Sequence, residues 1–462
     1  MGGLVAVTLN PLADRTYRRL YGAQVVSLAG TGLSTVALAL LAYDLAGERA
    51  GAVLGTALAL KMVAYVGLAP VFGALAQRVR RRRMLVGLDL ARAALVASMP
   101  FVTEIWQVYT LIVLLNSCSA GFTPTFQATI PDVLPNEAVY TRALSLSRLA
   151  YDLENLLSPM LAAAALAVAS YDALFAANSL AFVVSAALVM SVTLPSSTAS
   201  PPGGGIWRNT TSGLRVYLKT PRLRGLLAMS LAVSAGGAMV IVNTVVYVRE
   251  YLDGSETDTA IAFAAMGGGS MAVALALPTL LDQRGERSFM LFGGLILGLS
   301  LLLGAVQPGF GGMLFIWVLL GVGSSLVQTP SGRLLARSGS QDDRPAIYAA
   351  HFALSHACWL IGYPLAGALG AGFGMAPTFA MLAGVAILAT LAARVLWPAQ
   401  DPSEICDQHV AGDHTHEHVH DEQHQHTHEG CEGPGPHSHQ HAHPAASHTH
   451  LDLVRCGTAP SS

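Results

Sequence analysis

Charged side chains are scarce in this sequence, and lysine is nearly absent. Asp, Glu, Lys and Arg make up 12% of its 462 residues, whereas an ordinary soluble domain has roughly 25%. The only lysines are Lys61 and Lys219, and both follow leucine. Because a P-loop requires Gly-Lys-Ser or Gly-Lys-Thr, the sequence contains no ATP site of that type. The composition indicates a membrane protein, for which we expect neither enzymatic activity nor a nucleic-acid partner.

Cysteine is also sparse, and no cleavable leader is expected. Cys118 and Cys358 fall in apolar stretches, and the other three cysteines lie after residue 400. This scatter does not form the pattern of a disulfide framework. Residues 1–21 lack an apolar run followed by a small-residue cleavage site, so we expect the first apolar stretch to be retained.

Long apolar stretches fill most of the chain before residue 398. A membrane-spanning helix needs about 20 mostly apolar residues, and stretches of that length alternate with short polar loops. The sequence therefore predicts an all-α membrane protein with twelve transmembrane helices. The expected spans are 22–45, 51–76, 84–102, 106–129, 140–168, 172–194, 223–248, 258–281, 289–306, 311–335, 346–371 and 376–396.

Arginine is distributed unevenly between the two sides of these spans. If the amino terminus is cytoplasmic, nearly all loop arginines, including the run Arg80–Arg83, fall on the cytoplasmic side. Only Arg49 and Arg249 fall on the opposite side. Since Lys and Arg concentrate in cytoplasmic loops, the pattern predicts that both termini are cytoplasmic.

The apolar region contains two related halves at a spacing of about 205 residues. Thr123-Pro124 in the fourth span matches Thr329-Pro330 in the tenth, and Pro159 in the fifth matches Pro364 in the eleventh. Such a repeat is typical of gradient-driven transporters, whose halves rock about a central site.

The repeat divides the chain into four expected regions. A linker rich in Ser, Pro and Gly separates the halves, and its Ile206–Lys219 stretch is expected to form a short basic helix along the membrane surface. The regions are a six-helix bundle at 1–194, a cytoplasmic linker at 195–221, a second six-helix bundle at 222–397, and a tail at 398–462.

The loop after the second span resembles the signature of the major facilitator superfamily, Gly-x-Leu-Ala-Asp-Arg-x-Gly-Arg-Arg. Gln77 stands at the usual Asp position and Arg80 at the usual Gly position, while the second half keeps both residue types in the corresponding loop. The resemblance implies that these loops control a switch between two conformations. The residues expected in the switch loops are Gly73, Arg78, Arg81, Arg82, Asp282 and Gly285.

A few ionisable side chains interrupt the apolar spans. Such groups are costly in hydrocarbon and usually serve function or pair with one another. Asp152 and Glu154 lie in the fifth span, about 200° apart around the helix, so one can face a cavity and the other a neighbouring span. A structural alternative pairs Asp152 with Arg148 one turn earlier. The candidates for proton coupling and translocation are Asp152, Glu154, His356 and Lys61.

Other polar residues in the spans have simpler explanations. Asp89 and Arg92 are three residues apart and are expected to form an ion pair. His351 is explained equally well as a residue near the start of its helix. Lys61 is either a counter-ion of a fifth-span carboxylate or a proton-linked switch.

Histidine is concentrated at the carboxyl end, where 14 of the 16 histidines lie. Most are separated by one residue, so an extended chain places their imidazoles on one side. Imidazole suits nickel, cobalt, copper and zinc, and a reference pKa of about 6.5 leaves most of these groups neutral near pH 7. Few apolar residues lie between them, so the tail is predicted to be disordered without metal. The candidate metal ligands are His409, His414, His416, His418, His420, His424, His426, His428, His437, His439, His441, His443, His448 and His450.

The stretches Pro124–Asp132 and Ser145–Pro159, together with the tail, resemble bacterial nickel-resistance exporters of the superfamily. The resemblance implies efflux of Ni(II), and also of cobalt, by proton antiport across the inner membrane. It implies a monomer in the lipid bilayer that requires no cofactor. The same body motifs resemble exporters of siderophores and drugs, so export of an organic compound, with a tail that only buffers metal, is the alternative. A third hypothesis is a membrane-anchored metal store without transport.

Overall fold

The computed structural model describes residues 9–195, 206–281 and 285–399, together with four strands after residue 404. The chain divides into two compact units, Met1–Ala399 and Gln400–Ser462. The first unit, called the body, is helical, and the second, called the tail, contains the strands. Each unit is described by itself.

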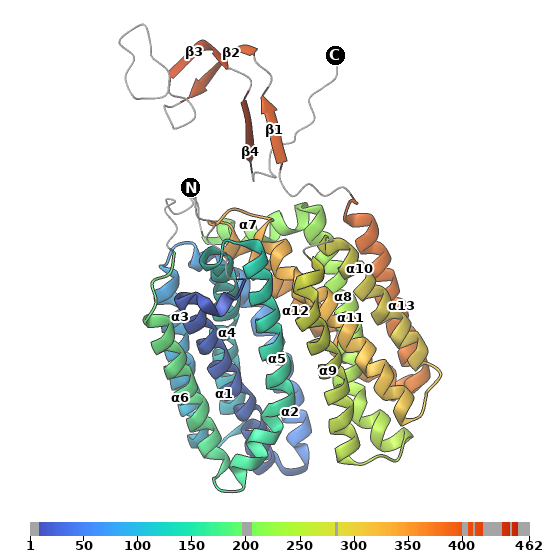
Figure 1. Ribbon diagram of the computed structural model, residues 1–462. Helices are drawn as coiled ribbons and strands as arrows, with labels where there is room; N and C mark the ends of the chain where they lie inside the picture. Colours follow the sequence, from blue (N-terminus) through green and yellow to red (C-terminus); the bar gives the residue numbers. More distant parts are fainter. Residues whose placement is uncertain are drawn as a thin grey trace. The chain divides into compact units, whose positions relative to one another are not determined.

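Long helices run up and down through the body (Figure 1). Within the described residues, eleven helices are long and apolar enough to cross a membrane. The prediction of an all-helical, multi-pass membrane protein is therefore confirmed. The helices are α1 (Arg15–Ala46), α2 (Ala50–Ala76), α3 (Arg81–Ala97), α4 (Ile105–Val133), α5 (Glu137–Leu166), α6 (Tyr171–Met190), α7 (Ile206–Lys219), α8 (Pro221–Val246), α9 (Glu256–Leu281), α10 (Glu286–Gly304), α11 (Phe310–Ala336), α12 (Arg344–Phe373) and α13 (Met375–Leu396).

Helix α5 is long enough to span a membrane, with 30 residues, but it is not among the eleven. Its start is capped by Asn136, whose side chain accepts a hydrogen bond from the Val139 backbone N–H at 3.1 Å. Charged residues interrupt its apolar face, and the helix packs them against α1 and α9. The twelfth span of the sequence analysis therefore stays a prediction.

The body consists of two six-helix bundles, α1–α6 and α8–α13, which lie side by side (Figure 1). The bundles meet along two helix pairs, α2 with α12 and α5 with α9. The two pairs are equivalent, because each joins the second helix of one bundle to the fifth helix of the other. The second helices are α2 and α9, and the fifth helices are α5 and α12. The packing thus follows the repeat seen in the sequence.

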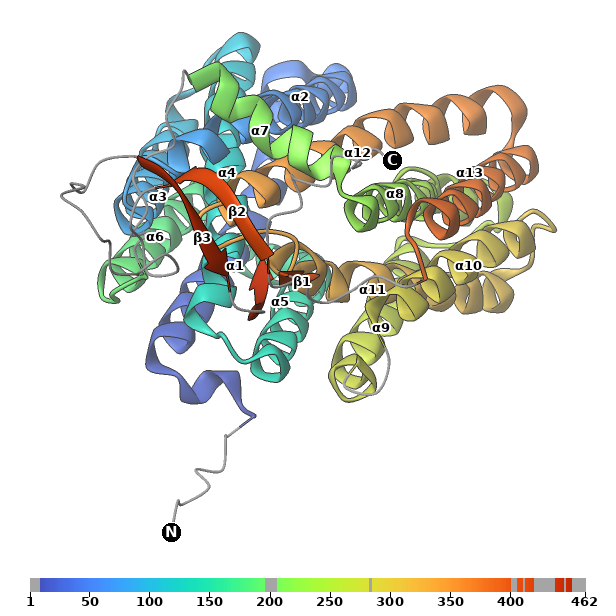
Figure 2. The same cartoon turned by 90° about the horizontal axis from the view of Figure 1, so that it is seen from above.

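Helix α7 lies across one end of the body (Figure 2), which we call the α7 end. The helix forms where the linker sequence predicts it, and it packs on α2 of the first bundle and α12 of the second. A Cβ on Gly213 would lie 2.4 Å from the backbone oxygen of Ala346, so the two helices touch there through their backbones. The linker helix therefore contacts both bundles as well as connecting them.

The tail contains two antiparallel strand pairs, where the sequence predicts disorder. Strand β1 (Ile405–His409) pairs with β4 (Ala446–His450), and β2 (Gly412–His418) pairs with β3 (His437–His443). The disorder prediction is wrong for these four segments, because alternation of histidine with other residues matches the two-residue period of a strand. His420, His424, His426 and His428 lie outside the described residues.

Candidate functional site

A cavity of about 520 Å³ lies between the two bundles. Helices α1, α2, α4 and α5 supply its wall on one side, and α8, α11 and α12 supply it on the other. The lining mixes aromatic rings with amides and hydroxyls, for example Gln24, Gln127 and Trp359. Both bundles thus share one central, mostly uncharged chamber.

Lys61, one of the translocation candidates, lines this cavity from the middle of α2. Its Nζ lies 5.6 Å from the centre of the Tyr65 ring, a cation–π distance. The Tyr65 ring packs edge-on against His356, with centroids 4.8 Å apart, and against Phe352 at 4.9 Å. Since Tyr65 belongs to α2 and the other two rings to α12, this cluster joins the bundles beside the cavity.

The two histidines of the body both line the cavity. The Nδ1 of His356 lies 2.7 Å from the backbone oxygen of Phe352. His351 is not a simple helix-start residue, because its Nδ1 lies 3.0 Å from the hydroxyl of Tyr217 in α7. Burial raises the pKa of Tyr217 well above its ordinary value, so this phenol stays uncharged. The linker helix is thereby tied to a side chain of the cavity wall.

Asp152 and Arg148 form the ion pair of the structural alternative, at 2.9 Å within α5. Ser270 of α9 joins them, because its hydroxyl donates to Asp152 at 2.6 Å and accepts from the Arg148 Nε at 3.0 Å. Asp152 is buried and is not among the residues that line the cavity, whereas Arg148 is. The three residues connect the bundles across the α5–α9 interface.

Glu154 points away from the cavity and toward α1. A Cβ built on Gly32 of α1 would lie 3.5 Å from the Glu154 Cγ, and Glu154 is not a lining residue. Among the described residues it forms no ion pair, although Lys61 interacts with it electrostatically. Neither fifth-span carboxylate therefore lies on the cavity wall itself.

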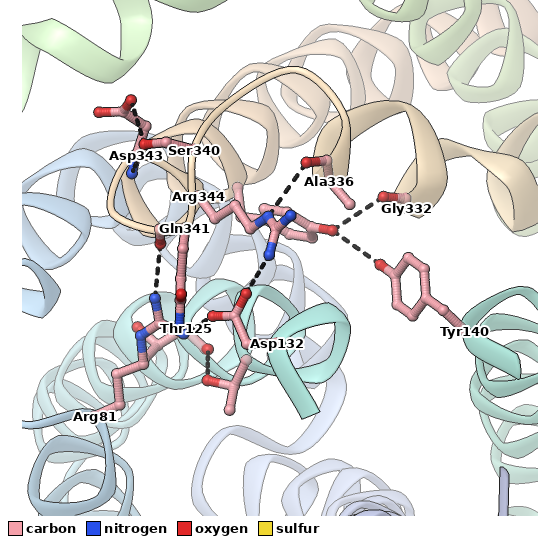
Figure 3. Close-up of polar contacts among 12 residues, drawn as sticks. Arg81, Thr125, Asp132, Tyr140, Gly332, Ala336, Ser340, Gln341, Asp343 and Arg344 are labelled. Carbon is pink, nitrogen blue, oxygen red and sulfur yellow. Dashed lines mark hydrogen bonds and ion pairs between the residues drawn. The ribbon is translucent and has the colours of Figure 1, made fainter. Parts of the chain in front are cut away.

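Three charged residues close the α7 end of the body (Figure 3). Asp132, in the last turn of α4, forms ion pairs with Arg81 at the start of α3 and with Arg344 at the start of α12. The Arg81 guanidinium also donates to the backbone oxygen of Gln341 at 2.9 Å. We call these three residues the gate. Asp132 is 1% exposed, so its carboxylate neutralises charge from both bundles in a buried setting.

Further contacts between the bundles surround the gate. The hydroxyls of Tyr140 in α5 and Tyr348 in α12 are 2.9 Å apart, and Tyr348 also donates to the backbone oxygen of Gly332 at 3.0 Å. Arg333 of α11 pairs with Glu137 of α5 at 2.5 Å. These contacts hold the bundles together at the α7 end in this conformation.

The structure places the predicted switch residues differently with respect to this gate. Arg81 is part of it, and Gly73 permits close packing, because a Cβ there would lie 2.6 Å from the Cβ of Ala349 in α12. The amide of Gln77, at the usual Asp position, donates to the backbone oxygen of Asp342 at 3.3 Å, so a neutral group keeps a contact between bundles. Arg82 donates a hydrogen bond to the backbone oxygen of Val192 at 3.3 Å, and Arg78 also has an interaction partner. Gly285 is the N-cap residue of α10. Asp282 lies outside the described residues.

No sequence pattern singles out Asp132 and Arg344, although both occur in stretches on which other predictions depend. Asp132 closes the Pro124–Asp132 stretch, and Arg344 contributes to the charge asymmetry. The signal that could have identified Asp132 is a single acidic residue, directly after a proline, at the end of an apolar span. The predicted Asp89–Arg92 ion pair is confirmed.

The described residues contain no group of three or more His, Cys, Asp or Glu side chains that could hold a metal. In the tail, the antiparallel register places His414 opposite His441, His416 opposite His439, and His418 opposite His437. Histidine positions more than a dozen residues apart in the sequence thus become neighbours.

The chain matches a known family over most of its length. The Major Facilitator Superfamily model matches residues 20–284 and 227–416. The uncharacterized MFS-type transporter YfiS of Bacillus subtilis (strain 168) is 30% identical over 122 residues, or 26% of this chain. The match spans only 29% of that relative's length.

Solved structures share the fold at low sequence identity. The human organic anion transporter MFSD10 has a TM-score of 0.73 at 14% identity, with 82% of this chain and 99% of that chain covered. The E. coli fucose:proton symporter FucP has a TM-score of 0.63 at 14% identity, with 83% and 98% covered. At these identities the likeness shows the fold alone.

Proposed function

Since the chain belongs to the major facilitator superfamily, we propose that it exports a divalent transition metal, nickel and also cobalt, in exchange for protons, and so confers metal resistance. The superfamily fold and the central cavity support transport. The observation that carries the metal assignment is the tail, which holds 14 of the chain's 16 histidines. Imidazole is a preferred ligand of these metals.

The α7 end is proposed to face the cytoplasm of a bacterial cell, with the body in the inner membrane. Its arginines support this orientation, because positively charged residues concentrate on the cytoplasmic side. The amino-terminal end of α1 and the carboxy-terminal end of α13 both lie at the α7 end. In the proposed orientation, the tail therefore begins in the cytoplasm. It can then collect metal before export.

The strand register of the tail supports metal binding. Opposed residues of antiparallel strands have Cα atoms only about 4.5–5.5 Å apart, and three such positions of β2 and β3 hold histidine on both strands. Ligands from separate His-x-His groups thus become available to one ion. Protons compete for imidazole, so binding should weaken as the pH falls through about 6.5.

Protons can supply the driving force for export. Moving a divalent cation out of a negative interior costs about 4.6 kcal/mol per 100 mV, twice the single-charge value. Two protons entering per metal cancel this electrical cost. Asp152 is balanced by Arg148, whereas Glu154 forms no ion pair among the described residues, so Glu154 is the better proposed proton carrier.

Metal uptake into inverted vesicles tests the proposal. Vesicles that contain the protein should take up radioactive nickel, supplied alone or with a small organic chelator, when the lumen is acidic, and a protonophore should abolish the uptake. Empty vesicles are the control. Nickel accumulation that is equal in both preparations, at every pH gradient, would contradict metal export.

The organic-compound alternative has one specific observation in its favour. The cavity has the 300–1,000 Å³ volume and the aromatic lining of sites for organic molecules, and its described lining has no metal-ligand cluster. Drug or chelator tolerance that persists without the tail, and with no metal phenotype, would favour this alternative.

Truncation of the tail after Pro402 should reduce metal tolerance by a moderate factor of about three to ten while leaving transport detectable. We expect this because chelation raises the local metal concentration, while the passage itself lies in the body. Tolerance assays and initial vesicle uptake rates at several nickel concentrations give the measurement. Loss of all flux by a folded truncated protein would show that the tail is part of the passage.

A further inference from the structure

The described lining of the central cavity carries positive charge without a matching carboxylate. Its charged residues are Lys61 and Arg148, and no Asp or Glu lines it. Arg148 is balanced from behind by Asp152. Within the described residues, Lys61 has no carboxylate at salt-bridge distance, and its close partner is the Tyr65 ring. Glu154 interacts with Lys61 electrostatically from outside the lining, so the ammonium group is the charge that a ligand in the cavity meets directly, with its counter-charge behind the wall.

This charge does not favour a bare divalent cation. An ammonium group at the cavity wall repels a cation of any hydration state. The Nδ1 atoms of the two lining histidines are engaged by Tyr217 and by the Phe352 backbone, which does not occupy either Nε2, but the described residues contain no group of three or more ligand side chains around them. A cation entering alone would find neither a carboxylate nor a ligand cluster on the described wall.

The remaining lining suits an organic ligand. Tyr151, Trp359 and Tyr363 offer aromatic faces, and Gln127 and Gln328 offer amide donors. A ligand with several carboxylates would meet Lys61 and these donors, and charge-assisted hydrogen bonds are the strong ones. The cavity volume of about 520 Å³ accommodates a small chelate.

We propose that the cavity binds a small organic polycarboxylate, that Lys61 holds one of its carboxylate groups, and that the metal crosses as the anionic chelate of this ligand. The inference rests on the proposed function, since it names the form in which the metal travels. It also changes the electrical argument, because an anion leaving a negative interior moves with the membrane potential. Export would then need fewer protons than a free ion requires.

The position of Lys61 explains how such a ligand could be coupled to movement. Lys61 stands against Tyr65 of α2, and Tyr65 packs on His356 and Phe352 of α12. A carboxylate that draws the ammonium group away from the Tyr65 ring changes the surroundings of the side chain through which α2 contacts the second bundle. Tyr65 thus contacts both the proposed ligand-binding lysine and the second bundle.

Double-label uptake tests the inference. Citrate is a suitable probe, because it is a tricarboxylate whose one-to-one nickel complex is anionic. Inverted vesicles receive nickel alone, citrate alone, or both, each with its own radioisotope. We expect nickel and citrate to enter together in equal amounts, and each to enter poorly alone.

The lysine variants give a matched comparison. Lys61→Gln should weaken the apparent affinity for nickel citrate by about tenfold, as expected for loss of a charge-assisted hydrogen bond, and Lys61→Arg should stay near the wild type. Lys219→Gln, at the end of α7 and outside the described cavity lining, removes the chain's other lysine and should leave affinity unchanged.

Each remaining outcome overturns the inference in a different way. Nickel uptake that needs no citrate and is unaffected by Lys61→Gln would mean that the free ion crosses, with metal export intact. Citrate uptake that never carries nickel, or no nickel uptake in any condition, would contradict metal export itself. If Lys61→Gln does not fold, the ratio of the two labels in wild-type vesicles still decides the question.

Discussion

Replacing Asp132 by asparagine should lower transport by at least about tenfold and open the α7 end to solvent. The carboxylate is shared by Arg81 and Arg344, so its loss leaves two guanidinium groups without an ion-pair partner at a buried position. Breaking a buried pair from one side costs about 3–5 kcal/mol, and each 1.4 kcal/mol is tenfold in a population ratio. Conformations with a closed gate should become rare.

Thiol labelling measures this shift. Ser331 lines the cavity from α11, so Ser331→Cys in a background without native cysteines reports access from the α7 end. Labelling should be faster with Asp132→Asn than with the unaltered gate. Asp253→Asn, which changes an exposed carboxylate, should alter neither labelling nor transport. Unchanged labelling with Asp132→Asn would show that the gate does not hold this end closed.

Replacing Asp152 by alanine should destabilise the protein by about 3–5 kcal/mol, because it leaves Arg148 without its counter-ion inside the bundle. The double variant Arg148→Met, Asp152→Leu should recover much of this loss, since apolar replacement of a buried pair is often neutral. Thermal unfolding in detergent compares the two variants. Glu250→Gln, at an exposed position, serves as the control.

The same double variant separates structure from proton coupling. If Asp152 takes part in coupling, the refolded double variant should lose the dependence of uptake on the pH gradient. Glu154→Gln removes the second carboxylate without disturbing an ion pair of the described residues. A wild-type pH dependence in both variants would exclude these two carboxylates from the mechanism.

Much of the body could be predicted from the sequence because its signals are local or repeated. Apolar length identifies spans, and the Thr-Pro pairs at Pro124 and Pro330 reveal the two halves. The Asp89–Arg92 pair follows from helical spacing alone. The pairing of α2 with α12 and of α5 with α9 then follows from the repeat.

The gate and the cavity contacts could not be predicted in the same way. Asp132 and Arg344 are 212 residues apart, and Tyr217 and His351 are 134 apart, so no periodicity links them. The helical spacing of Asp152 and Glu154 predicts that their side chains point in different directions from α5. It does not predict that neither side chain belongs to the described cavity lining. Low apolar content misled the prediction for the tail, because strand pairing there depends on alternation.

The gate residues are divided unequally between the bundles. Arg81 and Asp132 both belong to the first bundle, while Arg344 belongs to the second. When the bundles part at the α7 end, Asp132 can therefore keep one partner and lose only the other. Opening exposes a single unpaired guanidinium on the second bundle, and the first bundle keeps a neutral pair. Opening of the gate thus breaks the Asp132–Arg344 pair, and the Arg333–Glu137 pair between the bundles breaks with it. Arg81 stays beside Asp132 and keeps this carboxylate in position for the gate to close again.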